Sequence, residues 1–224
     1  MRTSSSDDVI HPLSDDVIQS SPDEIVKRLK THYDYTLRRD NPFKVLVSTI
    51  LSQRTKGINT KKASKRLFAY ADTPEALAEA DIHTVEQLVR PAGFYRVKAH
   101  RIVKAAQKIV DEFGGEVPDT IEELLQLEGV GRKTANCVLV YGFGKPALPV
   151  DVHVHRIANR LQLVDTKTPE ETERELKKVI PKKEWVAVNQ IMVAFGRDVC
   201  RPRNPLCEAC FLLDVCPTGK LLTG

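Results

Sequence analysis

The chain has 224 residues and a formal net charge of +4, with 42% hydrophobic, 29% charged and 6% aromatic residues. No apolar run approaches the ~18 residues of a membrane span, and the N-terminus lacks the apolar stretch of a signal peptide. We therefore expect an intracellular protein of the cytoplasm or nucleoid. Residues 1–24 hold one arginine against six acidic residues, a net charge of −5 that leaves +9 for the remainder. This basic remainder favours a polyanionic partner such as nucleic acid.

The predicted elements are helical along most of the chain. Residues 1–20, rich in serine and aspartate, are expected to form a disordered tail. A serine or threonine followed by proline or acidic residues is typical of a helix start, because the hydroxyl caps the first turn. Such starts occur at Ser21, Thr73, Thr120 and Thr168. Glycine and proline breaks separate the segments, and we expect about ten helices in an all-α fold.

Two segments leave helix and strand open. Val45–Leu51 is rich in β-branched residues and could form a buried strand. Val150–His155 alternates apolar and polar residues like a half-buried strand. Periodicity over so few residues does not separate the two structures.

A glycine turn joins two predicted helices. Apolar residues of Ile121–Leu127 have helical spacing, and Gly131 begins a second such run through Val138. Between them, Gly129-Val130-Gly131 predicts a turn whose missing Cβ atoms let a partner approach the backbone. The N–H groups at the start of the second helix would suit a DNA phosphate. A simple packing corner is the alternative interpretation.

Four of the five cysteines lie within the last 25 residues, with the spacing C-x6-C-x2-C-x5-C. Disulfides are rare inside cells, so four crowded thiolates indicate a metal centre. Structural zinc sites usually combine two close cysteine pairs, whereas only Cys207 and Cys210 are that close here. Zinc and an iron–sulfur cluster both stay open on spacing alone. The fifth cysteine, Cys137, is expected in the core.

The segment Leu127–Leu139 with Pro149-Val150-Asp151 resembles the helix-hairpin-helix, glycine/proline-aspartate superfamily of DNA glycosylases, and within it the endonuclease III family. The resemblance covers roughly residues 22–217. The supporting segments, all in the expected order, are Leu51–Thr55, Gly93–Tyr95 with Lys98-Ala99, Gly114–Pro118, Gly196-Arg197 and the cysteine cluster.

This resemblance implies that Lys133 is the nucleophile and Asp151 its carboxylate partner. A neutral lysine amine would attack C1′ of a damaged nucleotide and displace the base, and β-elimination from the resulting Schiff base would cut the strand on the 3′ side. Partial burial and a helix N-terminus both favour a neutral amine. Asp151 would stabilise the cationic sugar. The implied enzyme is a bifunctional glycosylase and AP lyase for oxidised pyrimidines. The alternatives are a surface lysine facing a phosphate and an aspartate that only caps a helix.

The resemblance also implies the cofactors, partners and architecture. It implies a [4Fe–4S] cluster on Cys200, Cys207, Cys210 and Cys216, a monovalent cation at the hairpin carbonyls, and damaged double-stranded DNA as partner of a monomer. A helical barrel of residues 35–145 would face a cluster domain of residues 21–34 plus 146–224 across a DNA-binding cleft. The expected DNA contacts are Arg54 and Phe94, at two wedge positions that fill the gap left by the extruded nucleotide, with Tyr95 beside them, Gly129, Val130 and Gly131 in the hairpin, and Arg201 and Arg203 near the cluster. The alternative for Phe94 and Tyr95 is a loop anchored by aromatic packing.

Three positions depart from the family pattern. Arg54 stands where glutamine is usual, Gly57 where an acidic residue is common, and Glu128 where proline is usual. Because of the departures at Arg54 and Gly57, the contacts to the base opposite the damaged nucleotide are not predicted. A mismatch glycosylase for thymine or uracil is therefore an alternative. A non-catalytic DNA-binding or redox protein is a further alternative, against which Lys133 and Asp151 argue. Lys98 and Arg101 could hold phosphates or simply be solvated, and His153 and His155 are expected to make packing or polar contacts.

Overall fold

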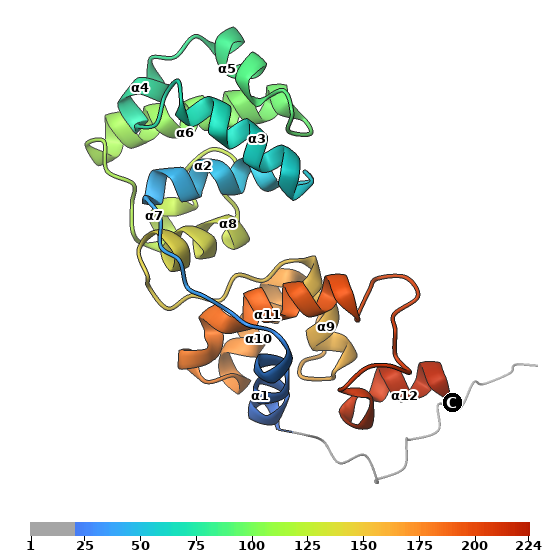
Figure 1. Cartoon of the computed structure of the whole chain (residues 1–224). Coiled ribbons are helices and arrows are strands. Elements are labelled where there is room, and N and C mark those ends of the chain that lie inside the picture. Colours follow the sequence, from blue (N-terminus) through green and yellow to red (C-terminus); the bar gives the residue numbers. More distant parts are fainter. Residues whose placement is uncertain (1–20) are drawn as a thin grey trace, which may run out of the picture.

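A computed structural model describes residues 21–224, and the predicted tail of residues 1–20 lies outside this range. The regular elements of the described residues are all helical, which confirms the all-α prediction (Figure 1). Every helix between residues 21 and 224 is too short or too polar to cross a bilayer. The upper lobe of Figure 1 contains α2 Pro42–Ser52, α3 Gly57–Phe68, α4 Pro74–Ala78, α5 Ile82–Val89, α6 Tyr95–Phe113, α7 Ile121–Leu124 and α8 Arg132–Cys137, the last continued by a π-helical turn, Val138–Gly142. The lower lobe contains α1 Pro22–His32, α9 Val152–Arg160, α10 Pro169–Val179, α11 Trp185–Asp198 and α12 Pro217–Thr223, with 3₁₀ turns at Lys182–Glu184 and Leu213–Val215.

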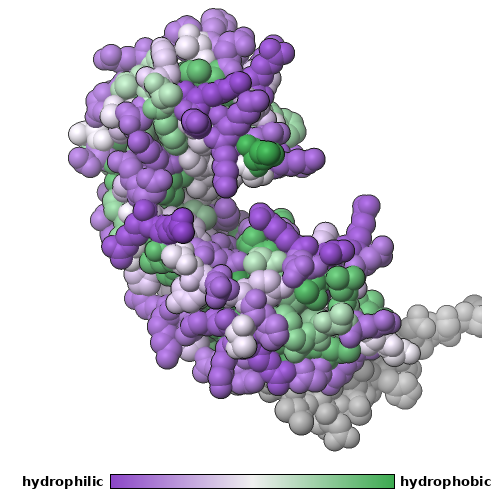
Figure 2. Space-filling model, in the orientation of Figure 1, coloured by the Kyte–Doolittle hydropathy of each residue, from purple (hydrophilic) through white to green (hydrophobic). Residues whose placement is uncertain are grey.

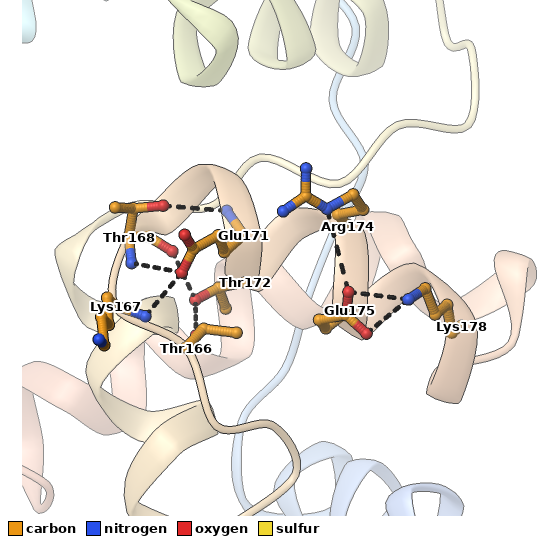
Figure 3. Close-up of polar contacts among 8 residues, drawn as sticks. All are labelled: Thr166, Lys167, Thr168, Glu171, Thr172, Arg174, Glu175 and Lys178. Carbon is orange, nitrogen blue, oxygen red and sulfur yellow. Dashed lines mark hydrogen bonds and ion pairs between the residues drawn. The ribbon is translucent and has the colours of Figure 1, made fainter.

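The predicted helix starts are confirmed. The hydroxyls of Ser21, Thr73, Thr120 and Thr168 each accept a hydrogen bond from a backbone N–H in the first turn that follows. At α10 the Glu171 carboxylate also accepts from the Thr168 N–H, so the two residues cap each other (Figure 3). Such reciprocal caps satisfy backbone donors that a helix end leaves free.

The first undecided segment is helical throughout, and the second is helical from Val152 onward. Val45–Leu51 lies inside α2, where Pro42 occupies the first turn and the Asn41 side chain accepts from the N–H groups of Phe43 and Lys44. The β-branched residues of α2 are accommodated because the helix face that carries Val47 and Ile50 is fully buried. Asp151 is the extended N-cap of α9, and Val152–His155 form the first turn of that helix.

Each lobe has its own hydrophobic core. The upper core runs from Phe43 to Ala147, and the lower core combines residues of α1 with Leu148–Val215. Helix α1 is held in the lower lobe by ion pairs from Arg28 to Asp214 at 2.7 Å and from Lys30 to Glu184 at 2.9 Å. The chain therefore passes from the lower to the upper lobe and back again (Figure 1). We retain the domain boundaries given above as a prediction.

A hollow opens between the two lobes (Figure 2). Polar contacts join the two lobes. The Arg132 guanidinium of α8 makes a two-point ion pair with the Glu173 carboxylate of α10, at 2.9 and 3.0 Å. The Tyr141 hydroxyl donates to Asn189 Oδ1 at 3.2 Å, and the Asn189 amide donates to the Pro149 carbonyl at 2.8 Å. Because Arg132 precedes Lys133, the ion pair fixes the start of α8 against the lower lobe.

We expect the Glu173→Gln variant to lose stability at neutral pH. Burial raises the pKa of Glu173, but hydrogen bonds from Arg132 and Lys177 outweigh it and hold the pKa below its ordinary value of 4.5. The ionised form therefore stabilises the fold above pH 4.5, and this contribution disappears as pH falls through the folded-state pKa. At neutral pH the free energy of unfolding should fall by about 2 kcal/mol, which is less than for a fully buried ion pair because Arg132 is half-exposed. This loss of stability relative to the wild type should shrink towards pH ~4.

Urea unfolding across this pH range measures both effects. The matched control is Glu175→Gln on the same helix, whose exposed ion pair with Lys178 (Figure 3) should contribute less than about 0.5 kcal/mol. A deficit for Glu173→Gln that stays constant with pH would contradict the assigned ion pair.

Candidate functional site

The hairpin turn between α7 and α8 requires glycine at one position. Gly129 has a φ of +79°, and a Cβ on it would lie 2.8 Å from Cδ of Arg101. Val130 is buried, and exposed Gly131 is the N-cap of α8, which receives no side-chain cap. The first N–H groups of α8 are therefore open to an outside acceptor.

Lys133 and Asp151 come from different lobes and approach the same buried thiol. Lys133 is half-buried in the first turn of α8, and Asp151 precedes α9. Cys137, at the end of α8, is 4% exposed, as expected for a core residue. Burial raises the pKa of Cys137; the nearby Lys133 amine lowers it, and the Asp151 carboxylate raises it further. Both charged groups thus lie within electrostatic reach of one sulfur atom.

Asp151 also caps α9. Its Oδ1 accepts from the N–H groups of His153 at 2.8 Å and Val154 at 3.0 Å. Oδ1 therefore fixes the start of the helix, whereas Oδ2 has no hydrogen-bond partner within the described residues. The helix-cap alternative for Asp151 is therefore real and compatible with a second role. His153 and His155 make the expected polar contacts, with Arg156 at 3.2 Å and with Thr172 at 2.7 Å.

Arg54 and Phe94 form an exposed pair on the upper lobe. Both residues have left-handed backbones, with φ of 51° and 55°, which are uncommon for residues other than glycine. The Arg54 guanidinium lies 5.7 Å from the centre of the Phe94 ring, and Phe94 is 64% exposed. Tyr95 differs from its neighbour, since it is half-buried and packs against the upper core.

Lys98 is neither a solvated charge nor a phosphate ligand, the two roles that the sequence left open, whereas Arg101 is partly exposed and its role stays a prediction. Lys98 is 3% exposed, and its ammonium is enclosed by oxygens of residues 51–55. The side chain of Arg101 packs over Gly129. Sequence reasoning also missed Gln53, whose side-chain amide donates to the Gly129 carbonyl at 3.0 Å. No local pattern signals these contacts, because Gln53 and Gly129 are 76 residues apart.

The four C-terminal cysteines surround one pocket, together with apolar residues such as Phe195 and Leu212. Donors already point at the sulfurs: Arg160 Nη1 at 3.4 Å from Cys200 Sγ, Leu212 N at 3.4 Å from Cys210 Sγ and Gly219 N at 3.2 Å from Cys216 Sγ. Such hydrogen bonds stabilise thiolates and tune iron–sulfur clusters.

Four cysteines lining one largely apolar pocket suit an iron–sulfur group. Tetrahedral zinc needs its four sulfurs gathered about 2.3 Å from one point, whereas a cluster of several irons holds them further apart. The donor set of four cysteines around a pocket therefore fits an iron–sulfur group. Arg201 and Arg203, in the loop beside it, are exposed.

Comparisons with known proteins agree with this arrangement. Residues 47–182 match the model of the HhH-GPD superfamily of base excision DNA repair proteins, and residues 200–216 match the iron–sulfur binding domain of endonuclease III. Endonuclease III of Thermotoga maritima is 54% identical over 89% of this chain and 92% of its own length. A non-covalent endonuclease III–DNA complex has a TM-score of 0.83 and 36% identity, over 89% of this chain and 95% of the other.

A trapped covalent endonuclease III–DNA intermediate is similar to the same degree, with a TM-score of 0.82 and 37% identity over 90% of this chain and 95% of the other. The iron–sulfur match decides the cofactor question in favour of iron over zinc. With a family model over more than half of the chain and relatives matched along nearly their whole length, the chain belongs to the endonuclease III family of base excision repair glycosylases with AP lyase activity.

Proposed function

We propose that this chain excises oxidised pyrimidines from duplex DNA, with Lys133 as nucleophile and Asp151 as its carboxylate partner. The observation that carries the proposal is that both side chains, one from each lobe, lie within electrostatic reach of the same buried thiol, that of Cys137. A half-buried lysine at an uncapped helix start and a carboxylate with one free oxygen are what displacement of a base by an amine requires.

The proposed reaction has two steps. Lys133 Nζ forms a bond to C1′ while the glycosidic C–N bond breaks, and the base leaves with the bonding electrons. The departing base takes up a proton, the new secondary ammonium loses one, and protonation of the ring oxygen O4′ as the C1′–O4′ bond breaks gives a protonated Schiff base between Nζ and C1′. Removal of a C2′ proton then expels the 3′ phosphate by β-elimination, and water releases the enzyme. The free Oδ2 of Asp151 stabilises positive charge on the sugar and moves the protons.

Borohydride trapping on a panel of duplexes tests this function. Reduction of the Schiff base should give a covalent adduct of the wild-type chain with thymine glycol duplexes and with abasic duplexes. The absence of an adduct on every oxidised pyrimidine and abasic duplex would sink the proposal and favour a non-catalytic DNA-binding protein. Faster excision from T:G or U:G mismatches than from thymine glycol would favour the mismatch alternative, which the exposed Arg54 at the wedge position makes worth including.

The remaining site residues are proposed as DNA contacts. The duplex would lie across the hollow between the lobes, with Arg54 and Phe94 entering the space left by the extruded nucleotide. Gly129, Val130 and Gly131 would hold one phosphate, and Arg201 and Arg203 would hold others near the cluster. Tyr95 would contribute from its half-buried position. A monovalent cation at the hairpin carbonyls is a further proposal; replacing potassium by a large organic cation should then weaken DNA binding. We also propose that the chain acts as an intracellular monomer.

The cysteine pocket leads to a separate prediction. We propose that Cys200, Cys207, Cys210 and Cys216 hold a [4Fe–4S] cluster, which supplies a rigid core for the C-terminal loop rather than reacting with the substrate. Cys207→Ser should reduce the iron content and the absorbance at about 400 nm by more than half, because one ligand is lost. Cys137→Ala is the matched control and should keep the iron of the wild type. Equal iron in both variants would contradict the ligand assignment.

A further inference from the structure

Lys98 is a buried cation outside the proposed chemistry. It lies near the start of α6 and is 3% exposed. Burial lowers the pKa of Lys98 to about 8. An ammonium in such surroundings is unfavourable unless hydrogen bonds compensate it, and apolar residues would fill the same volume at less cost. A role beyond simple packing is therefore expected of it.

Three oxygens surround this ammonium. Nζ donates to the Leu51 carbonyl at 2.8 Å, the Gln53 carbonyl at 2.5 Å and Thr55 Oγ1 at 2.7 Å. The two carbonyls lie at the end of α2, where the last turn has no helical partners and the helix dipole is negative. A side chain of α6 thus caps the C-terminal end of α2, although Lys98 lies 47 residues after Leu51 in the chain.

The Thr55 hydroxyl extends the link to a second loop. Its Oγ1 also accepts from the Gly93 N–H at 3.0 Å. The two loops touch so closely that a Cβ on Gly93 would lie 3.1 Å from the Arg54 carbonyl oxygen. Arg54 and Phe94 therefore project from segments held together by one ammonium and one hydroxyl.

Both projecting residues depend on that support. Their left-handed φ values, 51° and 55°, cost on the order of 1 kcal/mol each and persist only where surrounding contacts impose them. Contact between the Arg54 guanidinium and the Phe94 ring is on the surface, so it does not supply that constraint alone. The buried contacts of Lys98 and Thr55 supply this constraint on the two backbones.

Gln53 connects the same corner to the hairpin. Its side-chain amide donates to the Gly129 carbonyl at 3.0 Å and lies 3.4 Å from Thr134 Oγ1 in α8. The backbone carbonyl of Gln53 accepts from Lys98, so one residue faces the ammonium and the hairpin at once. The two loops and the start of α8 hence have a fixed mutual position.

We propose that Lys98 is a positioning residue that holds Arg54 and Phe94 as one preformed wedge, set at a fixed distance from the hairpin, for extrusion of the damaged nucleotide. The inference rests on the proposed function, because it assigns Arg54 and Phe94 to the space that the nucleotide leaves. A preformed wedge avoids the entropy loss of ordering two loops when DNA binds.

Substitution of Lys98 by methionine tests the wedge. Methionine keeps most of the length and volume but makes none of the three hydrogen bonds. Two single-turnover rates are compared, both normalised to the amount of enzyme that borohydride can trap. One is base excision from a thymine glycol duplex, and the other is strand cleavage of the same duplex with a preformed abasic site. An abasic nucleotide has no base to unstack, so it is extruded more easily. Excision should fall roughly 100-fold, because small misplacements are costly, while cleavage falls less than about fivefold.

Equal losses in both rates, or no loss in either, would overturn the proposal, since a general loss of folded enzyme affects both alike. Thr55→Val keeps the buried charge and removes only the hydroxyl, so it decides the question if Lys98→Met does not fold. It should show the same split, with excision reduced roughly tenfold. Lys104→Met, on the exposed face of α6, is the matched control and should leave both rates within about twofold. Failure of the wild-type chain to trap would count against the proposed function instead.

Discussion

The Lys133→Ala variant should give no borohydride-trapped adduct with any duplex that traps the wild-type chain. Without the amine there is no Schiff base to reduce, and β-elimination has no covalent intermediate from which to start. Strand cleavage at an abasic site should fall by at least roughly 10³-fold under single-turnover conditions, because the nucleophile is removed entirely. Denaturing gels measure the adduct and the cleaved strand together.

Two further measurements separate chemistry from binding. Removal of one charge beside a phosphate should weaken DNA binding by less than about tenfold, as a gel-shift titration at fixed salt would show. Lys178→Ala, an exposed lysine of α10 outside the site, should trap like the wild type. An adduct that persists in Lys133→Ala would assign the nucleophile to another amine and refute the proposed mechanism.

Asp151→Asn should reduce turnover while leaving the fold intact. Asparagine is as good an N-cap as aspartate, so the hydrogen bonds to His153 and Val154 at the start of α9 are kept. What is lost is the negative charge that, in the proposed mechanism, stabilises the cationic sugar. Loss of one such electrostatic contact typically costs 10²–10³ in rate, so we expect base excision to fall roughly 100-fold while DNA binding changes little.

Asp151→Ala serves as the comparison, because it removes the cap as well as the charge. It should lower the free energy of unfolding by about 1 kcal/mol relative to Asp151→Asn, a shift of roughly 2–4 °C in Tm. The two variants should have similar excision rates once corrected for folded protein. Wild-type excision by Asp151→Asn would reduce Asp151 to a helix cap.

The sequence predicted the helices and their starts better than the contacts that connect them. Caps at Ser21 and Thr168 are local, since the hydroxyl and its N–H partners are three residues apart, and a single sequence shows them. The β-branched segment Val45–Leu51 stayed undecided because the choice depends on the core that surrounds α2 and not on its own pattern.

Lys98 illustrates what could not be predicted. An isolated lysine is most often exposed, and nothing near it in sequence shows that two carbonyls and a hydroxyl enclose it. The same holds for the ion pair of Arg132 with Glu173, which joins residues 41 positions apart in different lobes. Metal ligands are easier, because four cysteines in 17 residues have few other uses, although the choice of metal needed the family match.

The position of α1 in the lower lobe has a consequence for synthesis. All core residues of the upper lobe have been added to the growing chain by Ala147, whereas the lower core needs Ile25 near the beginning and Val215 near the end. During translation the upper lobe can therefore form its core first. At that stage the residues of the lower lobe against which α1 packs have not yet been synthesised. The lobe that carries Lys133 can therefore be complete long before the lobe that supplies Asp151, so the two groups proposed for catalysis come together only late in synthesis.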